Sequence, residues 1–139
     1  MYAPKELILA IGTNIDQEMN MFVAKQLISQ LFHHVVFTSE IWTNPVNIHS
    51  DSFLNCLAYT QTTHGLKQIK QAIRQIEHKC GVSQAMKHAG YVKLDIDILF
   101  FDGTRYHEED WERHYVQHLI QELTDRNITH SITPEITPY

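Results

Sequence analysis

The sequence predicts an α+β fold, in which a mostly antiparallel sheet carries helices. Two patterns along the chain predict it: short apolar runs rich in β-branched and aromatic residues, typical of strands, and longer segments with apolar residues every three to four positions, typical of helices. The 139 residues, 43% hydrophobic and 19% charged, fit one globular domain. A net charge of −5 without a basic block speaks against nucleic acid as the main partner.

The first part of the chain predicts a strand, a helix and a second strand. Residues 7–11 form a short apolar strand that stops at Gly12, and Asn14 or Asp16 can cap the helix that follows. The apolar positions of this helix predict one buried stripe, at Val23, Ala24, Leu27, Ile28 and Leu31. Residues 34–43, rich in Val, Phe, Ile, Thr and Trp, predict the second strand.

The middle of the chain predicts a loop, a third strand and a second helix. A polar loop at 44–52 precedes a strand at 53–62. The apolar spacing of 3, 4, 3, 4 predicts a helix that Gly81 ends, with its buried face at Leu66, Ile69, Ile73, Ile76 and Cys80. Residues 82–90 have small and polar side chains and predict a mobile segment.

The last part predicts a strand at 94–101, a hairpin at Asp102-Gly103, a helix at about 108–124 and an irregular tail at about 125–139. The element order predicts a ferredoxin-like βαββαβ core with helices on one face, extended by the C-terminal hairpin and helix, in a single domain over 1–139. No apolar run approaches the ~20 residues of a membrane span, and the N-terminus lacks signal-peptide features. We therefore expect a cytoplasmic protein with no membrane partner.

Two carboxylates interrupt the apolar segment at 94–101. Alternation along a strand places Asp95 and Asp97 on one face, about 6.7 Å apart along the strand. The opposite face is wholly apolar and should be buried, at Val92, Leu94, Ile96, Ile98 and Phe100. Neighbouring carboxylates on a half-buried sheet raise each other's pKa unless a cation lies between them, and Mg²⁺ with carboxylate and phosphate ligands would relieve the repulsion. The alternative is a solvated outer face of an amphipathic strand.

Five short motifs follow one another in a recognisable order. They are Gly12-Thr13-Asn14, Thr43-Asn44-Pro45, Phe53-Leu54-Asn55, Ile76-Glu77 with Gly81, and the run 94–99. In this order and spacing the chain resembles the 6-hydroxymethyl-7,8-dihydropterin pyrophosphokinase family, most clearly over residues 7–103. The resemblance implies transfer of a pyrophosphoryl group from ATP to the reduced pterin in folate biosynthesis, with release of AMP. It also implies two Mg²⁺ ions held by Asp95 and Asp97, which would be the catalytic residues.

The resemblance further implies which residues contact the substrates. The positions that match pterin contacts are Thr43, Pro45, Val46, Phe53, Asn55 and Tyr115. Asn55 offers a donor and an acceptor to a pterin edge, although it could also be a satisfied polar residue of the sheet. Tyr115 could equally be core packing. The positions assigned to the nucleotide are Glu77, Lys87, His88, Lys93, His107 and Arg113. Glu77, His107 and Arg113 could instead be solvated surface residues.

The segment before the aspartates departs from the family pattern. Val82, Gln84 and Val92 stand where the family has arginines, and Ala89 stands where it has a tryptophan. Lysine is a point charge that cannot reproduce a bidentate guanidinium contact with phosphate. Three functions therefore remain open: a pyrophosphokinase of low activity, a catalytically degenerate relative that binds a pterin-like or nucleotide ligand, and an interaction domain that reuses the fold.

Overall fold

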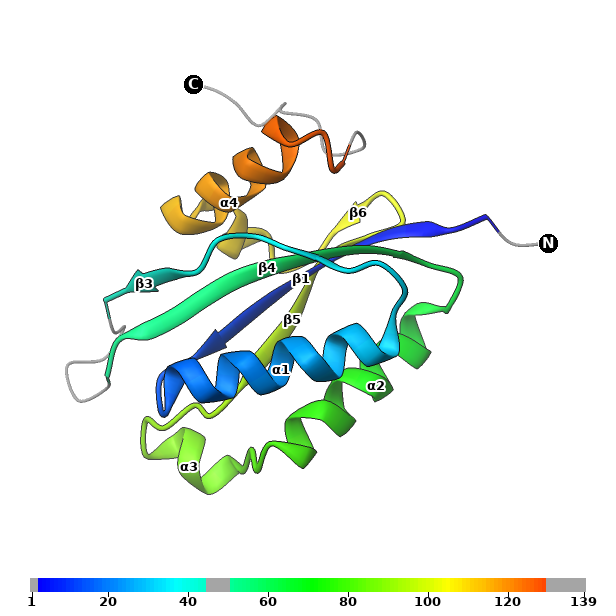
Figure 1. Ribbon diagram of the computed structural model, residues 1–139. Helices are drawn as coiled ribbons and strands as arrows, with labels where there is room; N and C mark the ends of the chain where they lie inside the picture. The colour runs from blue at the N-terminus through cyan, green and yellow to red at the C-terminus, as the bar shows by residue number, and fades with distance from the viewer. Residues whose placement is uncertain (1–2, 45–50, 130–139) are drawn as a thin grey trace.

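The computed structural model describes residues 3–44 and 51–129, and within them six strands form one antiparallel sheet (Figure 1). The strands are β1 (Lys5–Thr13), β2 (Val36–Phe37), β3 (Ile41–Thr43), β4 (Phe53–Thr62), β5 (Asp95–Phe101) and β6 (Thr104–Arg105). Their order is β2-β4-β1-β5-β6, with β3 also paired to β4. The predicted α+β class with an antiparallel sheet is confirmed.

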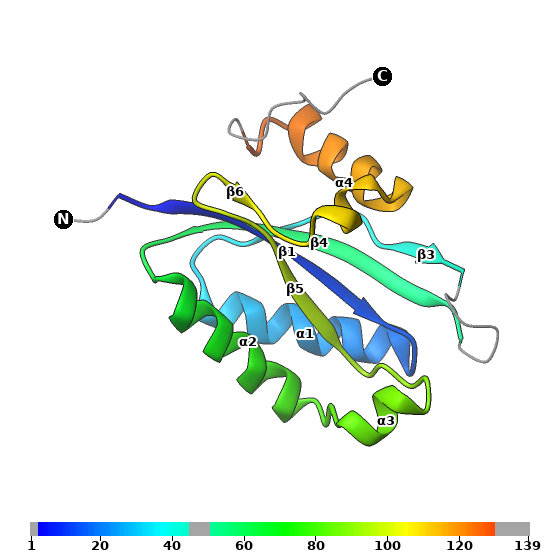
Figure 2. The same ribbon diagram turned by 180° about the vertical axis from the view of Figure 1, so that it is seen from behind.

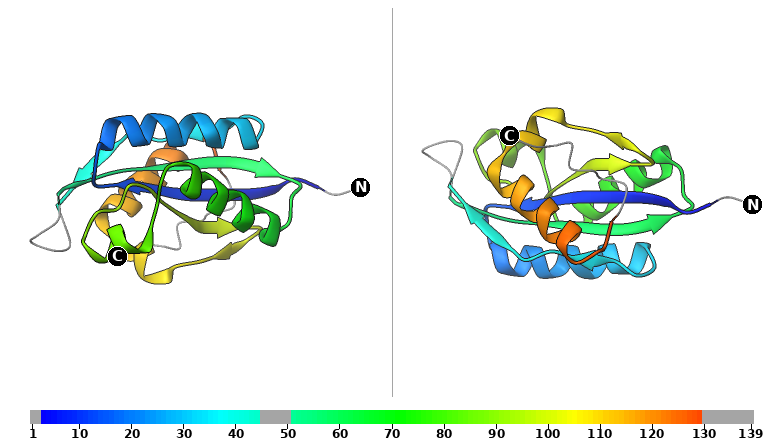
Figure 3. Two further views of the ribbon diagram at one scale, coloured as in Figure 1. Left: turned by 90° about the horizontal axis from the view of Figure 1, so that it is seen from below. Right: turned by 90° about the horizontal axis from the view of Figure 1, so that it is seen from above.

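Helices cover both faces of the sheet. The helical elements are α1 (Gln17–Leu31), α2 (Leu66–Lys79), α3 (Gln84–His88), the 3-10 helix η1 (Glu108–Glu112) and α4 (His114–Asp125). The two views of Figure 3 show the layers in turn, with α1 and α2 in front of the sheet in one view and α4 in front of it in the other. Within the described residues, no helix combines the length and the apolar character that a membrane crossing requires.

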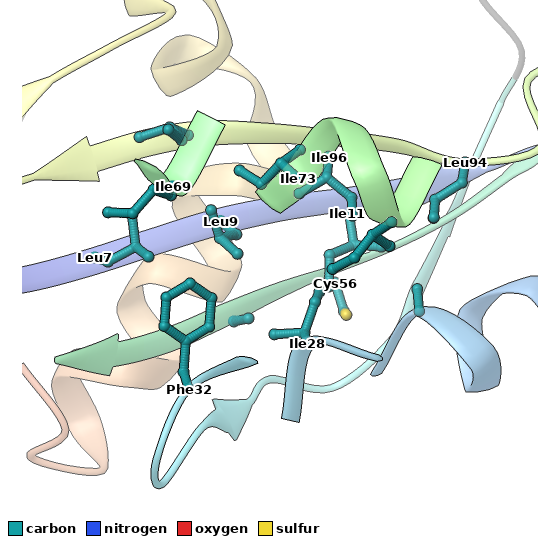
Figure 4. Packing of buried hydrophobic residues seen from close by; sticks show 14 of the residues in the cluster. Leu7, Leu9, Ile11, Ile28, Phe32, Cys56, Ile69, Ile73, Leu94 and Ile96 are labelled. Carbon is teal, nitrogen blue, oxygen red and sulfur yellow. The ribbon is translucent and has the colours of Figure 1, made fainter. Parts of the chain in front are cut away.

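Each face of the sheet has its own hydrophobic cluster. Leu9 and Ile11 of β1 point toward α1 and α2, where they pack with Ile28 and Ile73 (Figure 4). Ile8, the residue just before Leu9, faces the opposite way and packs under α4. Because both faces of β1 are covered, its central residues are apolar almost without interruption, in place of the alternation typical of a half-exposed strand.

The predicted strand at 34–43 is interrupted, and this prediction is wrong at its centre. Phe37 pairs with Ala58 and Ile41 with Asn55. The chain thus advances four residues from Phe37 to Ile41, whereas β4 advances only three between their partners. Thr38 lies in the gap, where its hydroxyl accepts the Leu57 N–H at 2.8 Å in place of a backbone carbonyl. A side-chain acceptor thus allows the extra residue that separates β2 from β3.

Phe100 is buried as predicted, but it does not share a face with Leu94, Ile96 and Ile98. The pairing with β1 shifts between Ile8 and Leu9, which face Phe100 and Ile98 respectively. This irregularity turns both Leu99 and Phe100 toward α4, while Phe101 returns to the other cluster. The alternation therefore holds through Ile98 but not at Phe100.

Two helical elements and one buried face also differ from those predicted. The helix expected at 108–124 begins as η1 and breaks at Arg113, because the buried Trp111 ties η1 to the sheet by donating its indole N–H to the Leu99 and Tyr106 carbonyls. The segment 82–90 contains the short helix α3, which buries none of its residues. In α1 the buried residues are Met21, Ala24 and Ile28, while Leu31 is exposed.

Candidate functional site

Asp95 and Asp97 lie between two cavities on opposite sides of β5. The first cavity, of about 190 Å³, lies between the sheet and the η1–α4 region, and the second, of about 330 Å³, lies on the side of α2. Figure 2 shows β5 between α2 and α3 on one side and α4 on the other. Both aspartates line both cavities, so a ligand in either cavity could reach the carboxylate pair.

The strand pairing fixes the position of the carboxylates. Asp95 pairs with Gly12 and Asp97 with Ala10 on the central strand β1. Burial, followed by the neighbouring Asp95, raises the pKa of Asp97 to about 7. His107 lowers that pKa, and its Nε2 lies 3.8 Å from the Asp97 Oδ1. Ionising both carboxylates is therefore unfavourable, and a bound cation would stabilise their charged forms.

The chemistry of the pair fits a hard divalent cation. Two carboxylates provide oxygen ligands, and Mg²⁺ commonly completes its shell with water and phosphate oxygens. Within residues 3–44 and 51–129, no group of three or more His, Cys, Asp or Glu side chains is arranged to hold a metal. A metal at Asp95 and Asp97 would thus take its remaining ligands from a bound substrate or from water.

Glu77 is a third carboxylate beside this strand. Its Oε2 accepts the Ile96 N–H at 2.9 Å, which connects α2 to β5 between the two aspartates. Burial raises the pKa of Glu77, although the Ile96 N–H lowers it. Glu77 also lines the second cavity, so its side chain both positions α2 and contributes negative charge to that cavity.

Asn55 presents an amide oxygen toward the first cavity. Its Nδ2 donates to the Thr43 Oγ1 at 2.9 Å and to the Ile41 carbonyl at 3.2 Å, which holds the buried side chain in one orientation. Its Oδ1 lies over Gly12, where an added Cβ would approach within 3.2 Å. In the described part of the chain no group donates to this oxygen, so it can accept a hydrogen bond from a ligand.

Two aromatic rings complete the first cavity. Phe53 from β4 and Tyr115 from α4 both line it, and the Arg113 guanidinium lies 4.8 Å from the centre of the Tyr115 ring. Tyr115 has a pKa raised mainly by burial. Arg113, assigned from the sequence to the nucleotide, therefore lies on the Asn55 side of the aspartates.

The other predicted nucleotide contacts divide into two groups. Lys87 and His107 line the second cavity together with Glu77. His88 is exposed and lines neither cavity, and Lys93 directs its Nζ over Gly81, where an added Cβ would meet it at 3.0 Å. Pro45 and Val46, two predicted pterin contacts, lie outside the described residues.

Three charged residues that line the cavities were not predicted as site residues from the sequence. Lys70 and Arg74 of α2 line the second cavity, and Asp110 of η1 lines the first. The spacing of Lys70 and Arg74 relative to Glu77 places all three on one face of a helix, which was the available signal. Asp110 had no comparable signal, because its position depends on how η1 docks against the sheet.

Asn14 connects the end of β1 to the entry of β5. It was predicted as a possible helix cap, but Asp16 occupies that position and the Asn14 side chain has another role. Its Nδ2 donates to the Gly90 carbonyl at 2.8 Å, and its Oδ1 accepts the Val92 N–H at 2.6 Å. This amide fixes the backbone just before the carboxylate strand.

Two comparisons with known proteins bear on the family of this chain. The sequence model of the 7,8-dihydro-6-hydroxymethylpterin-pyrophosphokinase (HPPK) family matches residues 8–125. A folate synthesis bifunctional protein, mitochondrial, from Arabidopsis thaliana is 30% identical over 122 residues, which cover 80% of this chain and 22% of that protein. The chain thus spans less than a quarter of the length of this relative. Because the family match covers most of the chain and includes the strands and helices around both cavities, the chain belongs to the 7,8-dihydro-6-hydroxymethylpterin-pyrophosphokinase family.

Proposed function

We propose that this protein transfers the pyrophosphoryl group of ATP to the hydroxymethyl group of 6-hydroxymethyl-7,8-dihydropterin, a step of folate biosynthesis, and that it requires Mg²⁺. The observation that carries the proposal is the position of Asp95 and Asp97 at the junction of two cavities. A transfer reaction requires two substrates to meet at one point, and the carboxylate pair is the feature that the cavities share.

The first cavity suits the pterin. The Oδ1 of Asn55 can accept from an amino or amide N–H of the pterin edge, and Phe53 and Tyr115 offer aromatic surface to a flat ring. Thr43 acts through Asn55, because its hydroxyl accepts from the amide and so fixes which end faces the ligand. Specificity on this side would come from a buried hydrogen-bond acceptor, which penalises ligands without a matching donor.

The second cavity suits the nucleotide. Lys87 and His107 are donors beside the aspartates, and Glu77 sets the distance between α2 and β5. When bound, Mg²⁺ would neutralise phosphate charge and orient the reacting oxygens. The residues of the chain would hold the phosphates and the hydroxymethyl group on either side of Asp97, and the catalytic contribution would be mainly positioning.

One observation favours the second candidate, a relative that binds these ligands but turns over slowly. Val82 stands at a position where the family resemblance implies an arginine. Its side chain packs against the hydrophobic cluster between the sheet and helices α1 and α2. Losing one preorganised donor aimed at transition-state charge typically costs about 10² to 10³ in rate. A slow enzyme and a ligand-binding relative therefore differ in rate rather than in site architecture.

The decisive experiment measures AMP formation from ATP and Mg²⁺ with and without the reduced hydroxymethylpterin, in a single turnover. AMP release that depends on the pterin, with a pterin diphosphate of matching mass, would support the proposal. Binding of both ligands without AMP formation would support the second candidate, a relative that binds the ligands without catalysing the transfer. Absence of binding to either ligand would overturn both and favour an interaction domain.

A further inference from the structure

One face of α2 carries two cations toward the second cavity. Lys70, Arg74 and Glu77 are four and three residues apart, so they share a face of the helix. That face adjoins the buried row of α2, which consists of Ile69, Ile73 and Ile76. Lys70 and Arg74 therefore line the cavity while their own side chains stay exposed to solvent.

These two cations and Lys87 are available for a ligand. Among the described residues, none of the three donates a side-chain hydrogen bond or forms an ion pair. Arg126, by contrast, is paired with Glu122 at 3.1 Å. The nearest carboxylate on α2, Glu77, accepts instead from the Ile96 N–H. Arg74 and Lys87 nevertheless lie close enough to Glu77 to lower its pKa.

The charges of this cavity are separated. Asp95, Asp97 and Glu77 lie on or against β5, whereas Lys70 and Arg74 stand on α2. A ligand that satisfies both sides needs a cation for the carboxylates and anionic oxygens for the ammonium and guanidinium groups. A magnesium polyphosphate has both, and a guanidinium can bind two phosphate oxygens at once. A neutral ligand would leave the cationic side unused.

We infer that Arg74 and Lys70 contact the phosphate chain of the bound nucleotide, with Arg74 making the stronger contact. This inference rests on the proposed function, because it assumes that the second cavity is the nucleotide site. Helix α2 would then supply two of the cations that line the second cavity, whereas segment 82–90 supplies only Lys87. Contacts from α2 would therefore distinguish nucleotides by their number of phosphates and not by their nucleoside.

The test compares two nucleotides across matched charge deletions. Binding of AMP and of a non-hydrolysable methylene analogue of ATP, each with Mg²⁺, would be measured for the wild type and for Arg74→Ala, Lys70→Ala and Lys79→Ala. Lys79 is an exposed cation of the same helix that lines neither of the two cavities, so its variant controls for the loss of one charge. Thermal unfolding of each variant would confirm that the fold is retained.

We expect Arg74→Ala to weaken the ATP analogue by about 10- to 100-fold and AMP by less than about 3-fold, since charge-assisted hydrogen bonds are stronger than neutral ones. Lys70→Ala should weaken the analogue by about 3- to 10-fold, and Lys79→Ala should change neither ligand. Arg74→Lys should recover part of the loss. Equal losses for AMP and the analogue, or no loss, would overturn the inference while the proposed function stands. A wild type that binds neither nucleotide would overturn both.

Discussion

The two cavities beside Asp95 and Asp97 are built from different kinds of residue. The first lies between the sheet and the η1–α4 region, and one of its polar groups, Asn55, is buried with its donor hydrogen-bonded to β3. The second is bounded by long side chains on the surfaces of α2 and α3, such as Arg74 and Lys87. One side is therefore preorganised by the sheet, whereas the other must order flexible side chains when a ligand binds.

This difference has an energetic meaning. A rigid acceptor such as Asn55 loses little conformational entropy on binding, so it can discriminate between similar ligands. Immobilising a long charged side chain costs roughly 0.5 to 1.5 kcal/mol, which must be offset by contact with phosphate. We expect affinity for the pterin to depend on geometry, and affinity for the nucleotide to depend on charge and on salt concentration.

The largest effect should come from the residue that both cavities share. Asp97→Asn keeps the shape of the side chain but removes a charged oxygen ligand, so pyrophosphoryl transfer should fall by about 10² to 10³. Single-turnover AMP formation at saturating ATP, Mg²⁺ and pterin measures this rate. Asp102→Asn is the control, since Asp102 is exposed, lines neither cavity and has a positive φ that Asn tolerates. Similar rates for Asp97→Asn and the wild type would contradict a shared metal anchor.

A smaller and one-sided effect should follow from Asn55→Ala. Loss of the buried acceptor should weaken pterin binding by about 10- to 100-fold, because the ligand donor is left without a partner, and should leave nucleotide binding unchanged. Titration calorimetry with each ligand separates the two. Thr43→Val removes one of the acceptors that orient the amide and should cost less than Asn55→Ala. An equal loss for pterin and nucleotide would show that the cavities do not act separately.

Gly12→Ala tests the same cavity through crowding. The added Cβ would lie 3.2 Å from the Asn55 Oδ1, and the amide cannot retreat without stretching its bonds to β3. We expect a loss of about 1 kcal/mol of stability and a pterin affinity reduced by several-fold. Gly65→Ala, whose Cβ would meet nothing closer than 4.0 Å, controls for the substitution itself. Unchanged pterin affinity in Gly12→Ala would place the ligand elsewhere.

The smallest effect concerns the dependence of stability on pH without metal. The ordinary pKa of Asp97 is 3.8, and in the folded protein burial and Asp95 raise its pKa to about 7. The folded state thus binds the proton more tightly than the unfolded state, and this group lowers stability as pH rises from about 4 to about 7. Because the side chain is 34% exposed, the loss should be only on the order of 1 kcal/mol.

Denaturant unfolding in chelator at pH 4 and pH 8 checks this sign. Relative to the wild type, Asp97→Asn should gain stability at pH 8 and gain little at pH 4, because the variant has no proton to release. The opposite slope would mean that His107 stabilises the ionised carboxylate more than burial destabilises it.

Local periodicity predicted the fold well where a pattern depends on one element. The buried row of Ile69, Ile73 and Ile76 on α2 followed directly from the spacing of apolar residues. The interruption at Thr38 and the turned side chain of Phe100 could not be predicted, because each depends on the register against another strand.

The site shows the same division. Asp95 and Asp97 were identifiable because charges inside an apolar strand are unusual. Arg74 was not, because an exposed arginine on an amphipathic helix is ordinary until the helix is placed beside β5. Lys93 precedes the first residue of β5, so strand alternation does not govern its direction, and its side chain lies over Gly81.

The Asn14 amide has a mechanical consequence. Segment 82–90 is bounded by Gly81 and Gly90, with φ of 82° and 91°, and Asn14 holds the backbone on the far side of the second glycine. Because of these hydrogen bonds, a backbone rotation at the two glycines would not displace β5. A rotation at these glycines would move helix α3 and Lys87 relative to a bound nucleotide, while the carboxylate pair keeps its place on the sheet.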